Sequence, residues 1–109
     1  MSELVVEATL EDPGPPAPAL GMLYLISLMR YSVERVLEGE YPHRELYAGH
    51  AGADLTSSAF RSGARHRLEL TRTFPQHASV ESAFDVGDLG AWYCERYEVL
   101  SPGDSATAR

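Results

Sequence analysis

The chain has 109 residues and a hydrophobic content of 44%, which is enough for one small domain with a single core and argues against global disorder. Sixteen acidic residues oppose nine basic ones, and the net charge of −7 argues against a broad nucleic-acid-binding face and against docking on an anionic membrane. The single cysteine, Cys94, excludes an intrachain disulfide and a CxxC metal motif.

The N-terminal sequence MSELVVEATLEDPG has neither a basic region nor a long apolar stretch of the kind found in secretion signals. The longest apolar-rich run, ALGMLYLISLM, is about half the length that a bilayer-spanning helix needs. We therefore expect no membrane insertion and, by default, a cytoplasmic location, with a periplasmic or secreted location left open.

The first two segments of the chain are a strand and a loop. In residues 3–10, apolar and polar side chains alternate with period two and include β-branched residues, which predicts a β-strand. Residues 11–21 contain four prolines and two glycines. Proline removes a backbone donor and fixes φ, so this segment is predicted to be a long Pro-rich loop.

Residues 22–38 carry two competing patterns. Apolar residues recur at helical spacing, and Gly39 would end such a helix, which would make the protein α+β. Alternatively, Arg30 and Ser32 mark the polar positions of a strand whose alternation slips by one residue near 35–37, as a β-bulge would cause. Periodicity alone does not decide between these two structures.

The second half of the chain is predicted to contain three more strands separated by loops. Residues 65–72 give the clearest pattern, because Leu68 and Leu70 alternate with Arg67 and Glu69. In order, we expect a strand at 44–50, a loop at 51–64, a strand at 65–72, a turn-rich segment at 73–91, a strand at 92–100 and a disordered tail at 101–109, so that residues 1–100 form a single β-rich domain.

The stretches YSVERVLEGEY, RELYAGH and FRSGARHRLEL resemble a recurring module. They are similar to small OB-fold-like barrels of the netrin (tissue-inhibitor)-like kind, including short modules that accompany bacterial polysaccharide acetylation proteins. The resemblance covers residues 4–72 and implies a mostly β fold, a small OB-like open barrel of about five strands with a long Pro-rich loop, with a helix at 22–38 as the alternative. The matching positions are Val33, Val36, Leu37, Gly39, Tyr41, Leu46, His50, Phe60, Gly63, Arg67, Leu68 and Leu70.

Few residues are arranged as a catalytic or metal site would require. None of the four histidines is spaced as HxH or HxxxH, and His50 and His66 are weak metal candidates only because a hairpin could make them neighbours. Ser57 or Ser58 could join His50 and Asp54 in a Ser-His-Asp site, but no GxSxG sequence frames either serine. We therefore predict no cofactor and favour a role without catalysis.

Two groups of residues are candidates for ligand binding. An arginine cluster could clamp a carboxylate, a phosphate or an acidic partner, or could be the solvent face of a strand paired with glutamates. Aromatic side chains could stack on a sugar or peptide on an OB-like surface, or could fill the core. The predicted binding residues are Arg61, Arg65, Arg67, Arg72, Tyr47, Trp92, Tyr93 and Tyr97.

These observations favour a non-catalytic binding or accessory module that recognises a protein or carbohydrate partner, or that serves as a subunit of a larger complex. The alternative is a small metal-binding protein or hydrolase-like enzyme that uses His50, His66 and the 54–58 loop. Nucleic acid is the poorest ligand class because of the acidic charge.

Overall fold

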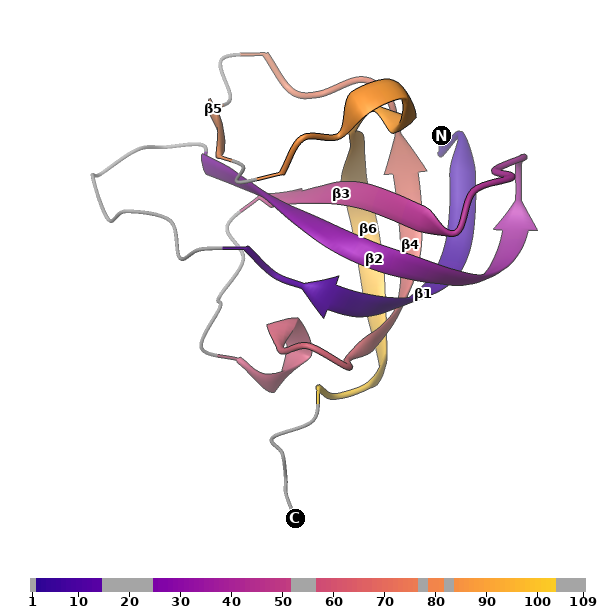
Figure 1. Cartoon of the computed structure of the whole chain (residues 1–109), viewed down its shortest axis with the longest axis vertical. Coiled ribbons are helices and arrows are strands. Elements are labelled where there is room, and N and C mark those ends of the chain that lie inside the picture. The colour runs from indigo at the N-terminus through magenta and orange to yellow at the C-terminus, as the bar shows by residue number, and fades with distance from the viewer. Residues whose placement is uncertain (1, 15–24, 52–56, 77–78, 82–83, 104–109) are drawn as a thin grey trace.

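A computed structural model of the chain describes residues 2–14, 25–51, 57–76, 79–81 and 84–103, and its regular structure is almost entirely β (Figure 1). Most of the predicted Pro-rich loop and residues 104–109 of the predicted tail lie outside the described residues. The elements are β1 (Leu4–Asp12), β2 (Leu25–Glu38), β3 (Glu45–Ala51), the 3-10 helix η1 (Ser58–Phe60), β4 (Arg65–Thr71), β5 (Ser79–Glu81), the 3-10 helix η2 (Gly87–Leu89) and β6 (Trp92–Ser101).

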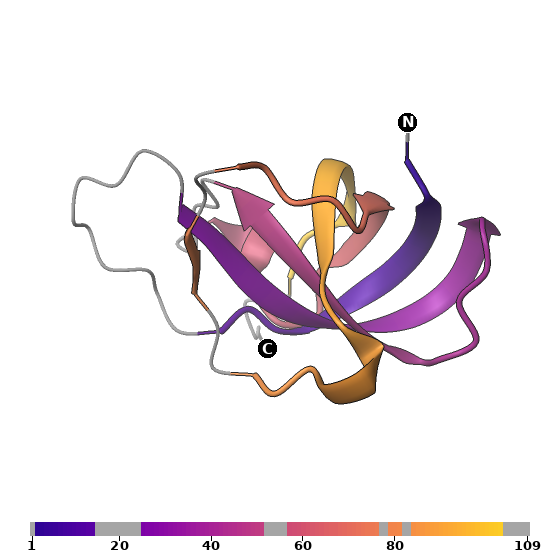
Figure 2. The same ribbon diagram turned by 90° about the horizontal axis from the view of Figure 1, so that it is seen from above.

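Five strands form a closed barrel in the order β1-β4-β6-β3-β2, and the pairing of β2 with β1 completes the circuit. The pairing is antiparallel except between β3 and β6, which run parallel, and the short β5 adds to β2 outside the circuit. Figure 1 shows β1, β2 and β3 crossing in front of β4 and β6, and Figure 2 shows β2 curving from one side of the barrel to the other. The prediction of a small, mostly β barrel is confirmed, although the barrel is closed rather than open.

The segment 25–38 is a strand, so the helical alternative is wrong for these residues. The helical spacing of its apolar residues arises because Ile26, Leu28 and Met29 are all buried at an end of β2 that is covered on both faces. In the ladder between β1 and β2, Glu34 and Leu37 of β2 have no partner residue in β1. Each skipped residue is a bulge, and bulges increase the local bend that a strand needs to wrap around a barrel. The predicted slip near 35–37 is therefore a real feature.

The interior of the barrel is filled by alternating side chains from all five strands. In β1, the inward residues are fully buried while Glu7 and Thr9 between them are partly exposed, as the sequence pattern predicted. The interior residues are Leu4, Val6, Ala8, Leu10, Met29, Tyr31, Leu46, Ala48, Phe60, Ala64, Leu68, Leu70, Trp92 and Cys94. No helix among the described residues is long and apolar enough to span a bilayer.

The turn after β2 depends on Gly39. Its φ is +87°, and a Cβ added there would lie 2.6 Å from the backbone oxygen of Glu3. We expect Gly39→Ala to lower the free energy of unfolding by about 2–4 kcal/mol, because strain at positive φ adds to a clash with backbone. Gly87→Ala is the matched control, since Gly87 has φ +55° with open space around it. Gly87→Ala should lower the free energy of unfolding, measured by urea denaturation, by about 1 kcal/mol. Equal losses in the two variants would show that the close contact at Gly39 is unimportant.

The C-terminal end of β6 is held against η1. The backbone N–H of Gly103 donates a hydrogen bond of 2.7 Å to the carbonyl of Ser58. Gly103 is buried, and a Cβ added there would lie 2.5 Å from the backbone oxygen of Arg61. This contact fixes the direction of β6 at the end where η1 closes the barrel.

Candidate functional site

A chain of buried polar groups crosses the barrel interior. The Tyr31 hydroxyl of β2 lies 2.7 Å from Nε2 of His50 on β3 and 2.7 Å from Nδ1 of His66 on β4. Nε2 of His66 lies 2.6 Å from the carbonyl oxygen of Ala59 in η1. The two histidines are 3% and 0% exposed, so all of these hydrogen bonds are made away from water. His50 and His66 do lie close together, with ring centroids 6.2 Å apart, and Tyr31 links them by hydrogen bonds. They are not neighbours across a hairpin, as the sequence suggested, because β3 and β4 do not pair.

The direction of each hydrogen bond in this chain follows from its last acceptor. A carbonyl oxygen can only accept, so Nε2 of His66 carries the proton and donates to Ala59. In the neutral imidazole, Nδ1 of His66 then accepts from the Tyr31 hydroxyl. The Tyr31 oxygen in turn accepts from Nε2–H of His50. The three side chains thus form a one-way relay of donors, from His50 through Tyr31 to His66, and it requires an unprotonated Nδ1 on His66 and an un-ionised Tyr31 hydroxyl.

Burial favours these neutral forms. It lowers the pKa of His50 to about 3, and the nearby His66 adds to the effect. It also lowers the pKa of His66, although the hydrogen bond to Ala59 opposes the shift. Burial raises the pKa of the Tyr31 hydroxyl well above its usual value. Near neutral pH the relay is therefore uncharged throughout.

Two aromatic rings enclose the relay. Phe60 lies 5.1 Å from His50 and 5.5 Å from His66 between ring centroids, and Tyr97 lies 5.4 Å and 5.7 Å from the same two rings. We call Tyr31, His50, Phe60, His66 and Tyr97 the aromatic cluster. Four of the five side chains are buried, whereas Tyr97 reaches the surface. The cluster thus connects the barrel interior to β6.

The side of β6 that faces away from β4 is largely unpaired by other described strands. β6 pairs with β4 from Ser101 back to Tyr93, but with β3 only at Trp92 and Tyr93. We call the side of residues 94–101 that faces away from β4 the β6 edge; no described strand pairs with it. The large hydrophobic side chains that stand exposed in the described part of the chain all lie on this strand: Tyr97 (46%), Val99 (39%) and Leu100 (37%).

Charged side chains on β4 and β6 alternate in sign. Arg67 lies opposite Glu98, with an ion pair of 3.9 Å, and Glu69 lies opposite Arg96. Arg96 forms no ion pair within 4.0 Å with any described residue. Shallow hollows lie over these side chains, the larger of about 570 Å³ between Ser2, Glu69 and Arg96. This surface therefore carries charge of both signs, and Arg96 has no ion-pair partner among the described residues.

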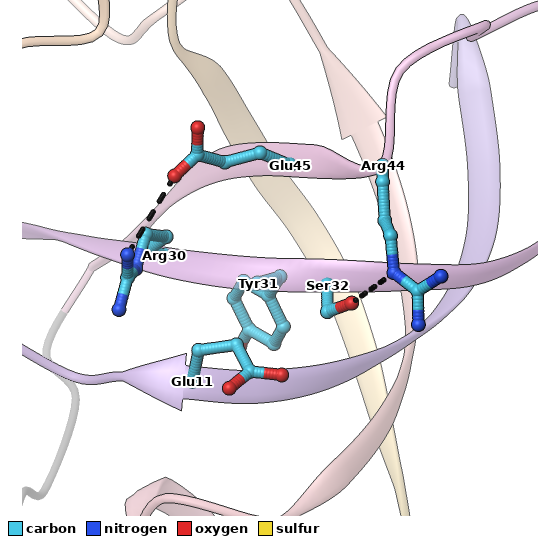
Figure 3. Close-up of a pocket in the computed structure, with 6 residues that line it drawn as sticks. All are labelled: Glu11, Arg30, Tyr31, Ser32, Arg44 and Glu45. Atoms are coloured by element: carbon cyan, nitrogen blue, oxygen red, sulfur yellow. Dashed lines mark hydrogen bonds and ion pairs between the residues drawn. The ribbon is translucent and has the colours of Figure 1, made fainter.

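A second hollow, of about 250 Å³, lies over β1, β2 and β3 (Figure 3). Arg30 pairs with Glu45 at 3.7 Å, and Nε of Arg44 donates to the Ser32 hydroxyl at 3.2 Å. Figure 3 shows the Glu11 carboxylate extending between these two contacts. Two arginines and two glutamates line this hollow, so it carries no excess of either charge.

The four predicted arginines are spread over the molecule. Arg65 pairs with Glu34 at 2.9 Å, and the guanidinium of Arg72 lies 3.8 Å from the Trp92 ring centroid. Arg61 lies beside Gly103 at the other end, and only Arg67 lies on the charged surface next to the β6 edge. The observed arrangement resembles the strand-face alternative more than a single anion clamp.

The predicted aromatic residues are mostly internal. Tyr47 and Trp92 are buried, and Tyr93 packs 5.7 Å from Phe74 between ring centroids. Tyr97 alone of these four is exposed. Sequence reasoning missed Arg96 and Glu98, whose signal was the opposite charges flanking Tyr97 in the sequence ERYE.

Three observations bear on the residues of the enzyme alternative, of which only His50, Ser57, Ser58 and His66 are described. No group of three His, Cys, Asp or Glu side chains among the described residues is placed to hold a metal ion. The Ser57 hydroxyl accepts from the Ala59 N–H at the start of η1, and Asp54 lies outside the described residues. Burial raises the pKa of the Cys94 thiol to about 12, so it is protonated and unreactive at neutral pH.

Comparison with known proteins found no matching family model, curated protein or solved structure.

Proposed function

We propose that this domain is a non-catalytic protein-binding module on an OB-like barrel, and that its β6 edge takes up an extended strand of a partner. One observation carries the proposal: the exposed large hydrophobic residues of the described chain gather on one strand, and one side of that strand is unpaired by any described strand. Unpaired backbone donors and acceptors beside apolar side chains are what strand addition uses. The closed five-strand barrel supports the OB-like assignment.

A protein partner fits this surface better than a carbohydrate. Sugar binding by stacking needs exposed aromatic planes, and of the predicted aromatic residues Tyr47 and Trp92 are buried. Tyr97, by contrast, presents a single ring next to Val99 on an edge that offers backbone hydrogen bonds. Extended peptides are recognised by such main-chain bonds together with alternate side chains.

The test is selection of random ten-residue peptides displayed on phage against the immobilised domain. We expect enrichment of peptides with β-branched and aromatic residues that also carry an acid and a base two positions apart, to face Arg96 and Glu98. Their binding should fall at least about tenfold in a Glu98→Pro variant, because proline removes a backbone donor and distorts the strand. Glu40→Pro, in the exposed turn after β2, is the control and should bind normally. A monomeric domain that enriches no peptides, or enriched peptides that are indifferent to Glu98→Pro, would refute the proposal.

A further inference from the structure

We propose that the strand received at the β6 edge is β6 of a second copy of this chain, which pairs antiparallel about a two-fold axis through Tyr97. The inference rests on the proposed function and names its partner.

Backbone geometry limits the registers in which β6 can pair with itself. In an antiparallel ladder, two opposite residues both point their N–H and C=O groups toward each other or both point them away. Because these two orientations alternate from residue to residue, a residue cannot lie opposite the residue next to it in a copy of the same strand. The two-fold axis must therefore pass between a residue and the same residue of the second copy. The candidates at the centre of the exposed stretch are Arg96, Tyr97 and Glu98.

Charge selects among these three registers. An axis through Arg96 places two arginines opposite each other, and an axis through Glu98 places two glutamates opposite each other; both arrangements are destabilising. An axis through Tyr97 places Arg96 of each copy opposite Glu98 of the other copy. Two cross-strand ion pairs form, and each uses Arg96, which has no ion pair with another described residue of its own copy.

The same register continues the charge pattern across four strands. Within one copy, Arg67 lies opposite Glu98 and Glu69 lies opposite Arg96. With the axis through Tyr97, the side chains that align across the four strands form two rows. One row consists of Arg67 and Glu98 of the first copy, followed by Arg96 and Glu69 of the second copy. The other row is its symmetry mate, so positive and negative side chains alternate along both rows.

The opposite face of this pairing is apolar at its centre. Tyr97 lies opposite Leu68 in β4, and on the axis it would lie next to Tyr97 of the second copy. An exposed aromatic pair gains from being covered, and aromatic cross-strand pairs stabilise sheets. Charges that only protect an edge from aggregation work best when they are alike and repel a copy. On the β6 edge, Arg96 and Glu98 have opposite signs, and each attracts its partner in a second copy when the axis passes through Tyr97.

Light scattering after size exclusion, with sedimentation equilibrium over a range of concentrations, tests the pairing. We expect the parent chain to dimerise. Arg96→Glu makes both positions acidic and Glu98→Arg makes both basic, so each variant alone should have a dimer dissociation constant at least about tenfold higher. An equal mixture of the two variants should form a heterodimer, because every cross-strand pair is then opposite in sign. Glu40→Arg, which makes the same charge change as Glu98→Arg away from the strand, should dimerise like the parent.

Each outcome bears on the pairing. A parent chain that stays monomeric, or single variants that dimerise as well as the parent, would refute it. If circular dichroism shows that one variant is unfolded, the milder Arg96→Gln or Glu98→Gln variant replaces it, since either substitution removes both cross-strand ion pairs of the dimer. A monomer that still selects peptides at the β6 edge refutes the second copy alone, whereas a monomer that selects none refutes the proposed function as well.

Discussion

A Tyr31→Phe variant is expected to unfold with a free energy about 2–5 kcal/mol lower than that of the parent chain. The substitution keeps the ring but removes the hydroxyl that joins His50 to His66. A donor on His50 and an acceptor on His66 would then be buried without a partner, and each such group costs about 1–3 kcal/mol. Urea denaturation at neutral pH measures the loss.

Tyr41→Phe is the matched control for that loss. The Tyr41 hydroxyl is half-buried and donates to the Glu45 carbonyl at 2.5 Å, so its removal breaks one hydrogen bond instead of two. We expect a cost of about 1 kcal/mol, near the usual net value of one hydrogen bond. If Tyr31→Phe cost no more than Tyr41→Phe, the relay would not be a cooperative part of the core.

The strands were largely predictable because this chain alternates apolar and polar residues where one strand face is buried. Residues 3–10 and 65–72 follow this rule, and the structure has strands at Leu4–Asp12 and Arg65–Thr71. Residues 22–38 did not follow it. Ile26 and Leu28 on one face of the strand and Met29 on the other face are all buried, which removes the alternation. There the tertiary structure decided between strand and helix.

The site was only partly predictable, because its parts meet through the barrel closure. The sequence suggested that His50 and His66 could be neighbours, but it could not show that Tyr31 stands between them, 19 and 35 residues away. It also gave no reason to separate Tyr97, which is exposed, from Trp92, which is buried on the same strand. That difference arises because β6 leaves β3 after two paired residues.

As the pH is lowered, the free energy of unfolding is expected to fall already near pH 6, before the carboxylates are protonated. The pKa values of His50 and His66 are lowered in the folded state, so the unfolded chain binds more protons below about pH 6.5. Stability is thus fully present above that pH and falls as the pH decreases, until His50 itself is protonated near a pKa of about 3. Each neutral buried histidine contributes a slope of about 1.4 kcal/mol per pH unit, so two of them contribute up to about 2.7.

The free energy of unfolding, measured by urea denaturation between about pH 5 and 7.5 at one fixed protein concentration, tests this dependence. His50→Gln should remove a large part of the slope, because the glutamine amide does not titrate. Glu3 and Glu34, whose pKa values are lowered by hydrogen bonds to Thr71 and Arg65, act in the same direction only below about pH 4.5. A flat profile between pH 5 and 7 would mean that the histidines take up protons in the folded barrel as readily as in the unfolded chain, so that burial does not hold them neutral.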